Sequence, residues 1–169
     1  LRHVYGGVAE YVSVPVDVIS LKPANLSFEE GAAVPMAAVT ALQGHRHHGE
    51  TQPMQKVLIN GASGGVRTFA VQIAKSYGSE VTGVTSTANL DLVRSLGADH
   101  VVDYTTTDFV RSGRRYDLIL DTVGNPSAPD LKRALAGGGT AAVVGFHQRC
   151  KADGRFAARR QGCRHGVAT

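Results

Sequence analysis

The chain has 169 residues, of which 43% are hydrophobic and 19% are charged, as is typical of a globular domain with its own core. No apolar run approaches the ~20 residues that a membrane-spanning helix needs, so membrane proteins of that kind are excluded. The formal net charge of +4 comes from residues 149–169, which carry six basic residues and one acidic residue. The rest of the chain is nearly neutral, so its charge does not favour nucleic-acid binding.

The two termini suggest that the chain is a fragment of a cytoplasmic protein. Both cysteines, Cys150 and Cys163, lie in the last twenty residues and form no CxxC pair, which favours a reducing compartment and no structural zinc site. Residues 1–7 lack an initiator methionine and the pattern of a signal peptide, so the N-terminus reads as cut. Residues 149–169 are expected to form a disordered basic tail, with non-specific binding to nucleic acid or acidic lipid, and foreign sequence, as the alternatives.

The N-terminal part predicts one strand and two helices. Residues 8–18 alternate apolar and polar side chains like an edge strand, which Pro15 ends. Ser27 and Glu30 have the spacing of a capping box at a helix start. Pro35 is expected to interrupt that helix, and residues 36–43 to form a second one.

Three histidines follow this second helix, at positions 45, 47 and 48. A metal site is one interpretation, but neighbouring histidines without a carboxylate to orient them are more often solvated. We therefore expect them to lie on the surface.

A regular alternation of strands and helices follows. Strands are expected at residues 57–60, 80–85, 100–102, 116–122 and 140–145. Helical segments are expected at residues 66–76, 88–96, 108–112 and 127–136. Short β-rich runs that alternate with amphipathic helices indicate an α/β fold: a Rossmann-type parallel sheet with helices on both faces.

The first strand leads into a glycine-rich turn and a helix, which is the unit that binds a dinucleotide pyrophosphate at a helix N-terminus. Against the G-x-G-x-x-G pattern, the turn reads Ala62-x-Gly64-x-x-Arg67. Arg67 replaces the glycine that lets helix and strand pack closely, so its side chain must leave along its aliphatic stem or push the helix outward. Strain or weakened binding is favoured over a useful phosphate contact.

The loop after the second predicted strand indicates which nucleotide is bound. An acid there would hold the ribose hydroxyls of NAD, but the loop offers Ser86 and Thr87 and no carboxylate before Asp91. Hydroxyl groups without a repelling acid favour NADP over NAD. The two hydroxyls can also cap the next helix.

Five motifs resemble one family in order and spacing: AEYVSVP, FEEGAAVPMAAVTAL, GASGGV followed by FAVQIAK, SLGADHVVDY, and YDLILDTVGN. Over residues 7–146 the chain resembles the zinc-independent, quinone oxidoreductase-like branch of the medium-chain dehydrogenases/reductases. The resemblance implies NADPH-dependent hydride transfer to a quinone, enone or related carbonyl. It implies a small-molecule substrate, no specific nucleic-acid or membrane partner, and a homodimer in full-length relatives.

The same resemblance implies a set of cofactor contacts. Ser63, Gly64, Gly65 and Val66 would lie on the pyrophosphate, and Ser86, Thr87 and Tyr104 beside the adenosine. The nicotinamide side would be lined by Thr40, at the start of the interdomain helix, with Asn125, Val144 and Gly145. No catalytic acid, base or nucleophile is assigned, since hydride transfer needs none if the nicotinamide is well positioned.

Met36 stands where zinc-dependent relatives have a cysteine ligand, and a thioether is a poor zinc ligand, so no metal is expected. No tyrosine has a lysine four residues on, which excludes the short-chain dehydrogenase pattern. The resemblance divides the chain into three parts. Residues 1–25 are expected to be a remnant of a GroES-like substrate domain, residues 26–148 the NADP-binding domain, and residues 149–169 the tail.

The alternative function is a catalytically inactive or truncated Rossmann-like domain.

Overall fold

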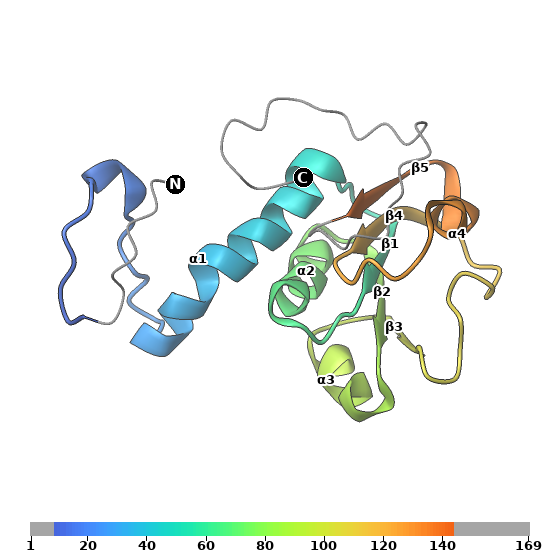
Figure 1. Cartoon of the computed structure of the whole chain (residues 1–169), viewed down its shortest axis with the longest axis horizontal. Coiled ribbons are helices and arrows are strands. Elements are labelled where there is room, and N and C mark those ends of the chain that lie inside the picture. Colours follow the sequence, from blue (N-terminus) through green and yellow to red (C-terminus); the bar gives the residue numbers. More distant parts are fainter. Residues whose placement is uncertain (1–8, 144–169) are drawn as a thin grey trace.

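A five-stranded parallel sheet forms the centre of the molecule. The computed structural model describes residues 9–143, and its strands run in the order β3-β2-β1-β4-β5 (Figure 1). They are β1 (Lys56–Asn60), β2 (Glu80–Thr85), β3 (His100–Asp103), β4 (Tyr116–Asp121) and β5 (Leu135–Val143). The predicted parallel sheet is confirmed, and its order reverses between β1 and β4, where α/β proteins of this type bind ligands.

Both faces of the sheet are covered, as the alternation predicts. The helices after β1 and β2 are α2 (Gly65–Ser76) and α3 (Leu90–Ser95), and their apolar side chains pack on one face with Val57, Ile59 and Leu118. The helix α4 (Ala128–Ala134) packs on the other face with Leu58 and Ile119. The central strands are buried on both sides, which explains their nearly continuous apolar sequences.

Two predicted helical segments are wrong in detail. Residues 108–112 form turns rather than a helix, although Phe109 and Val110 are buried against the α4 face. The helix predicted to reach residue 136 ends at Ala134, and β5 begins at Leu135. Pairing with β4 accounts for this difference, because Leu135 already pairs with Tyr116 in the sheet.

The helix α1 (Phe28–Gln43) is continuous, so the predicted break at Pro35 is wrong. Proline removes one hydrogen-bond donor but fixes φ near the helical value. The start of α1 is held by the predicted capping box: the Ser27 amide donates to Glu30 Oε2 at 2.8 Å, and the Glu30 amide donates to Ser27 Oγ at 3.1 Å. Its end is anchored by Ala41, which is buried against α2.

The edge strand predicted at residues 8–18 does not form in the part of the chain that the structure describes. From residue 9 to α1, the only regular element is a 3-10 turn, Val16–Val18, closed by a hydrogen bond from the Val18 amide to Pro15 O. Tyr11 is 91% exposed. A strand needs a neighbour for its backbone groups, and none lies alongside these residues in the described range.

His45 corrects a second expectation, because it is buried rather than solvated. It lies in the turn Gly44–His48 that follows α1, and its ring meets Tyr77 edge-on at 6.4 Å between centroids. Its Nε2 lies 3.0 Å from Ala70 O of α2, and its Nδ1 lies 3.0 Å from Thr51 Oγ1. Since the carbonyl can only accept, Nε2 carries the proton. The Thr51 hydroxyl, which has one proton to donate, lies within hydrogen-bond distance of both Nδ1 and His45 O.

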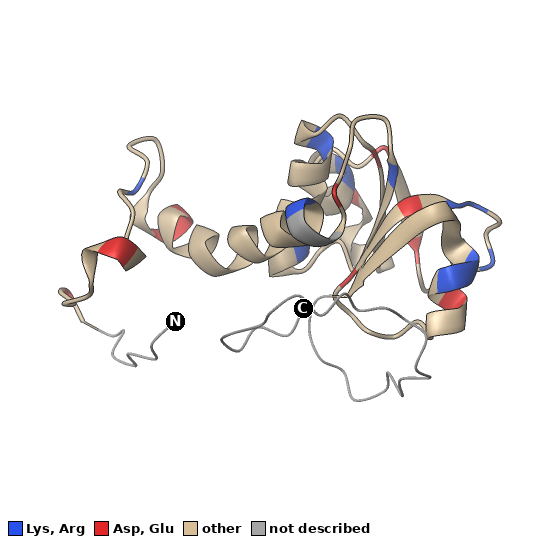
Figure 2. Ribbon diagram, turned by 90° about the horizontal axis from the view of Figure 1, so that it is seen from above, with Lys and Arg blue, Asp and Glu red and all other residues tan. Residues whose placement is uncertain are grey.

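The charged side chains are dispersed over the described residues. In Figure 2, α4 carries an acidic residue in its first turn and two basic residues in its last turn, while α1 is uncharged after its first turn. No helix in residues 9–143 is long and apolar enough to cross a membrane.

Burial of His45 predicts a pH-dependent stability. Burial lowers the pKa of His45 below its ordinary value of 6.5, against a smaller opposite effect of the bond to Ala70. The unfolded chain therefore binds more protons than the folded chain as pH falls below that value, and the free energy of unfolding should fall. Urea unfolding at about pH 7.5 and about pH 5.5 measures this loss.

His45→Gln should be less stable than the wild type near neutral pH but should lose less stability on acidification. His100→Gln is the matched control, because His100 is partly exposed on β3. If His45→Gln kept the full pH dependence of the wild type, buried His45 would not be its source.

Candidate dinucleotide site

A buried polar network joins the carboxyl ends of β1 and β4, where the strand order reverses. Asn60 Nδ2 donates to Asp121 Oδ1 at 2.8 Å and to Asn125 Oδ1 at 2.8 Å. Asp121 Oδ1 also accepts from the amides of Val123 and Gly124, at 3.0 and 3.1 Å. The network fixes the β4 turn beside the β1 turn and so defines the walls of the crevice between them.

The glycine turn places the N-terminus of α2 at this crevice. Gly61 has a φ of +78°, a conformation that side chains other than glycine rarely adopt, and Gly64 is the N-cap of α2. No side chain caps α2, and its first turn holds no acidic residue. Its first N–H groups therefore point to the crevice with a partial positive charge, as a pyrophosphate requires.

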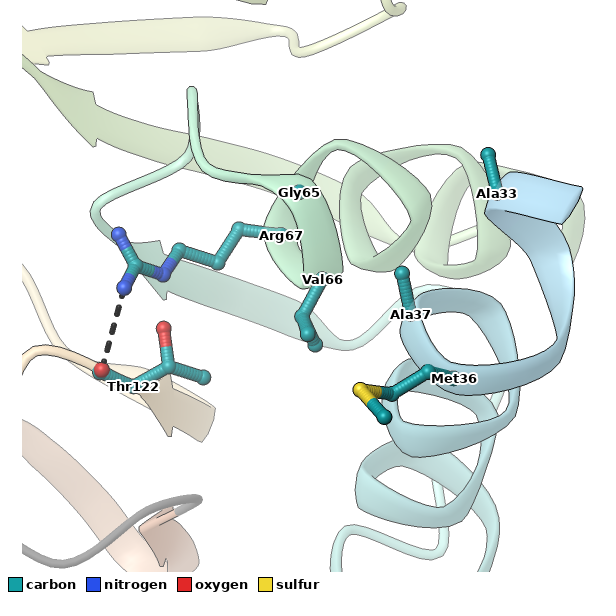
Figure 3. Close-up of a pocket in the computed structure, with 7 residues that line it drawn as sticks. All are labelled: Ala33, Met36, Ala37, Gly65, Val66, Arg67 and Thr122. Carbon is teal, nitrogen blue, oxygen red and sulfur yellow. Dashed lines mark hydrogen bonds between the residues drawn. The ribbon is translucent and has the colours of Figure 1, made fainter. Parts of the chain in front are cut away.

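Arg67 leaves the helix–strand interface along its stem, which is one of the two conformations that the sequence allows. Its Nη1 donates to Gly61 O at 3.1 Å and its Nη2 to Thr122 O at 3.2 Å, so the guanidinium joins the β1 and β4 turns (Figure 3). A Cβ added to Gly61 or Gly64 would lie 2.6 or 2.8 Å from Nη1. The guanidinium thus occupies space that the two glycines leave open.

An open cavity of about 500 Å³ lies between α1 and the N-terminus of α2. Figure 3 shows its two sides: Ala33, Met36 and Ala37 from α1, and Val66 and Arg67 from α2. Gly65 and Thr122 complete the lining. One wall is apolar and the other offers backbone N–H groups and a cation, which suits a ligand with an anionic part and a flat apolar part.

The predicted adenosine residues lie together at the ends of β2 and β3. Ser86 Oγ accepts from Asn89 Nδ2 at 3.1 Å, and Thr85 Oγ1 donates to Ser63 Oγ at 3.0 Å, which connects this loop to the glycine turn. Tyr104 is 60% exposed directly after β3. These positions are consistent with a ligand that crosses the carboxyl edge of the sheet from β1 to β3.

Asp103 is a residue of this region that the sequence analysis missed. The parallel register places Asp103 opposite Thr85, and its Oδ2 accepts from Thr87 Oγ1 at 2.5 Å. Hydrogen bonds from the hydroxyl of Thr87, and then from Thr105, hold the pKa of Asp103 below its ordinary value. A carboxylate therefore does lie at the predicted ribose loop, contributed by β3 rather than by the loop itself.

Of the residues predicted to line the nicotinamide side, only some lie at the site in the described structure. Asn125 joins the polar network, so its amide oxygen is already engaged. Thr40 lies near the end of α1 rather than at its start, and its hydroxyl donates to Met36 O at 2.6 Å. Val144 and Gly145 lie outside the described residues.

Metal-ligating side chains are not clustered in the described residues. Within residues 9–143, no three histidine, cysteine, aspartate or glutamate side chains lie close enough to hold a metal. Met36 is 82% exposed on the cavity wall.

The sheet order is that of a Rossmann-type domain, and comparison with known proteins identifies its family. Residues 65–164, more than half of the chain, match the family model described as zinc-binding dehydrogenase. The chain therefore belongs to this family, in the quinone oxidoreductase, enoyl reductase and alkenal reductase branch of the medium-chain dehydrogenase/reductase superfamily.

Three similar proteins illustrate this membership. The chain is 36% identical over 143 residues to 2-methylene-furan-3-one reductase of Solanum lycopersicum, covering 83% of the chain and 36% of that protein. It is 38% identical over 122 residues to the chloroplastic NADPH-dependent alkenal/one oxidoreductase of Arabidopsis thaliana, covering 71% of the chain and 31% of that protein. A solved quinone oxidoreductase from Coxiella burnetii is 31% identical with a TM-score of 0.64, over 71% of this chain and 38% of that one. The chain thus spans about a third of these relatives' length.

The polar network makes a testable contribution to stability. Asp121→Ala would leave the buried Asn60 amide and two partly buried backbone amides without their acceptor, and we expect it to lower the free energy of unfolding by about 3 kcal/mol. Chemical denaturation measures this loss.

Asp117→Ala is the matched control, because Asp117 lies on the same strand and accepts a single backbone bond, from the Lys56 amide at 2.8 Å. We expect it to cost about 1 kcal/mol. Equal losses in the two variants would contradict a special role for the network at the crevice.

Proposed function

We propose that this chain is the nucleotide-binding part of a zinc-independent, NADPH-dependent oxidoreductase that transfers hydride to a quinone, an enone or a related carbonyl. The observation that carries the proposal is the open cavity next to Thr122, at the end of β4, where the uncapped N-terminus of α2 faces an apolar wall from α1. The names of the relatives, an enone reductase, an NADPH-dependent alkenal/one oxidoreductase and a quinone oxidoreductase, support this substrate class.

The polar and apolar parts of the crevice would match the charged and apolar parts of the dinucleotide. The glycine turn and the first amides of α2 would bind the pyrophosphate, and the loop with Ser86 and Thr87 would bind the adenosine ribose, with Tyr104 beside the adenine. The apolar side chains of α1 would exclude water from the nicotinamide, which supplies the hydride when bound. Positioning of the nicotinamide, rather than an acid or base of this chain, is the role that we assign to these residues.

The domain assignment is also part of the proposal. Residues 1–25 would belong to a GroES-like substrate domain, residues 26–148 to the nucleotide-binding domain, and residues 149–169 to a basic tail outside the fold. The largely exposed, uncharged side chains on residues 11–21 and on α1, such as Leu21 and Phe28, are consistent with a neighbouring domain in the whole protein. A cytoplasmic location and a dimer of the whole protein stay predictions.

Fluorescence titration of the full chain tests cofactor binding. NADPH should bind at the crevice and quench or shift its nicotinamide fluorescence on contact with the apolar wall. The absence of binding by both NADPH and NADH would contradict the proposed function.

Asp103 should limit the preference for NADPH. Its carboxylate lies beside Thr87, where a 2′-phosphate would be repelled and a ribose hydroxyl would be accepted. Asp103→Asn should therefore raise the affinity for NADPH several-fold, while the affinity for NADH should stay the same or fall. The difference in binding free energy between the two cofactors should change by about 1 kcal/mol.

Asp91→Asn is the control for this change, because it removes a carboxylate that is exposed on α3 and paired with Arg94. Parallel titrations with both cofactors measure the ratio. An unchanged ratio in Asp103→Asn would place the ribose elsewhere.

A further inference from the structure

Arg67 brings a positive charge to the positive end of a helix. It lies in the first turn of α2, where backbone N–H groups already carry a partial positive charge and where an acidic residue would be favourable. The turn has no acidic residue and no side-chain cap. The sequence thus concentrates positive potential at one point of the crevice.

Nothing in the described residues neutralises this charge. Arg67 forms no ion pair in residues 9–143, and its two hydrogen bonds go to neutral carbonyl groups, Gly61 O at 3.1 Å and Thr122 O at 3.2 Å. These distances lie at the long end of the range for N–H···O bonds. A guanidinium with only such acceptors can exchange them for an anion, whose charge-assisted bonds are shorter and roughly twice as strong.

A second polar group of the crevice also lacks a partner. The hydroxyl Oγ1 of Thr122 is buried and has no hydrogen-bond partner in the part of the chain that the structure describes. Thr122 lines the same cavity as Arg67, and Figure 3 shows the two side chains facing each other. A buried hydroxyl without a partner is costly, so a ligand that bonds it would gain from both residues.

We propose that Arg67 binds the pyrophosphate of the dinucleotide and makes the site specific for ligands that carry one. This inference rests on the proposed function and assigns the contact to the residue that replaces a glycine of the turn. The guanidinium lies against Gly61 and Gly64, in the space where the glycine turn would admit a phosphate group. An anion entering the cavity would meet Nη1 and Nη2 there.

Calorimetric titration of the full chain tests the assignment with three probes: NADPH, inorganic pyrophosphate, and 2′-AMP, which has no pyrophosphate. Arg67→Ala should weaken NADPH binding by about tenfold or more, and pyrophosphate binding similarly, because a charge-assisted contact is lost. Binding of 2′-AMP should not change. Arg67→Lys should keep part of the affinity, since it retains the charge without the bidentate geometry.

Arg133→Ala is the matched control, because it removes one positive charge from α4 on the other face of the sheet, where Arg133 pairs with Asp130. Its affinity for the three probes should equal that of the wild type. The dependence of NADPH affinity on salt concentration should become weaker in Arg67→Ala and stay unchanged in Arg133→Ala.

The outcomes separate this inference from the proposed function. NADPH binding that is equal or tighter in Arg67→Ala overturns the inference, and the function stands with Arg67 as an obstacle. Loss of 2′-AMP binding in Arg67→Ala also contradicts it, because a contact specific for the pyrophosphate should leave the binding of a probe with only a 2′-phosphate unchanged. Pyrophosphate binding through Arg67 without NADPH binding overturns the function and leaves the anion contact, whereas absence of binding by both overturns the two together.

Discussion

The hydrogen bonds between Asn60, Asp121 and Asn125 are the constraint on which the site depends. They join the ends of the two strands between which the sheet reverses its order, and Asp121 also fixes the β4 turn through two backbone amides. A parallel sheet with covered faces leaves only its carboxyl edge for a ligand. The network lies at that edge, where the glycine turn, the N-terminus of α2 and Arg67 also lie.

The second determinant is the contrast between the two walls of the cavity. On the α2 side, backbone amides and a guanidinium present positive charge; on the α1 side, Ala33, Met36 and Ala37 present apolar surface. A dinucleotide has the matching division between its pyrophosphate and its nicotinamide ring. His45 stabilises the packing of the two helices that form these walls, because its ring, just after α1, is hydrogen-bonded to the carbonyl of Ala70 in α2.

Most of the fold could be predicted from the sequence, because buried parallel strands and amphipathic helices have distinct periodicities. The strand Glu80–Thr85 and the capping box at Ser27 were predicted as they are found. The strand at 8–18 was wrong, since alternation alone cannot supply a partner strand. The break predicted at Pro35 was wrong because the fixed φ of proline is compatible with a helix, although the residue lacks an N–H donor. Burial of His45 and the approach of Asp103 to Thr87 depend on tertiary packing and register, which local patterns do not contain. The stem of Arg67 could be foreseen to leave the interface, but not its two carbonyl partners.

The amide NMR spectrum of the full chain, titrated with NADP⁺, tests the central claim most directly. The account predicts the largest shift changes at Gly64, Gly65 and Val66, with further changes at Thr87 and Thr122. These amides lie along the carboxyl edge of β2, β1 and β4. Shift changes confined to other parts of the chain, or no changes at a saturating concentration, would contradict a dinucleotide site between β1 and β4.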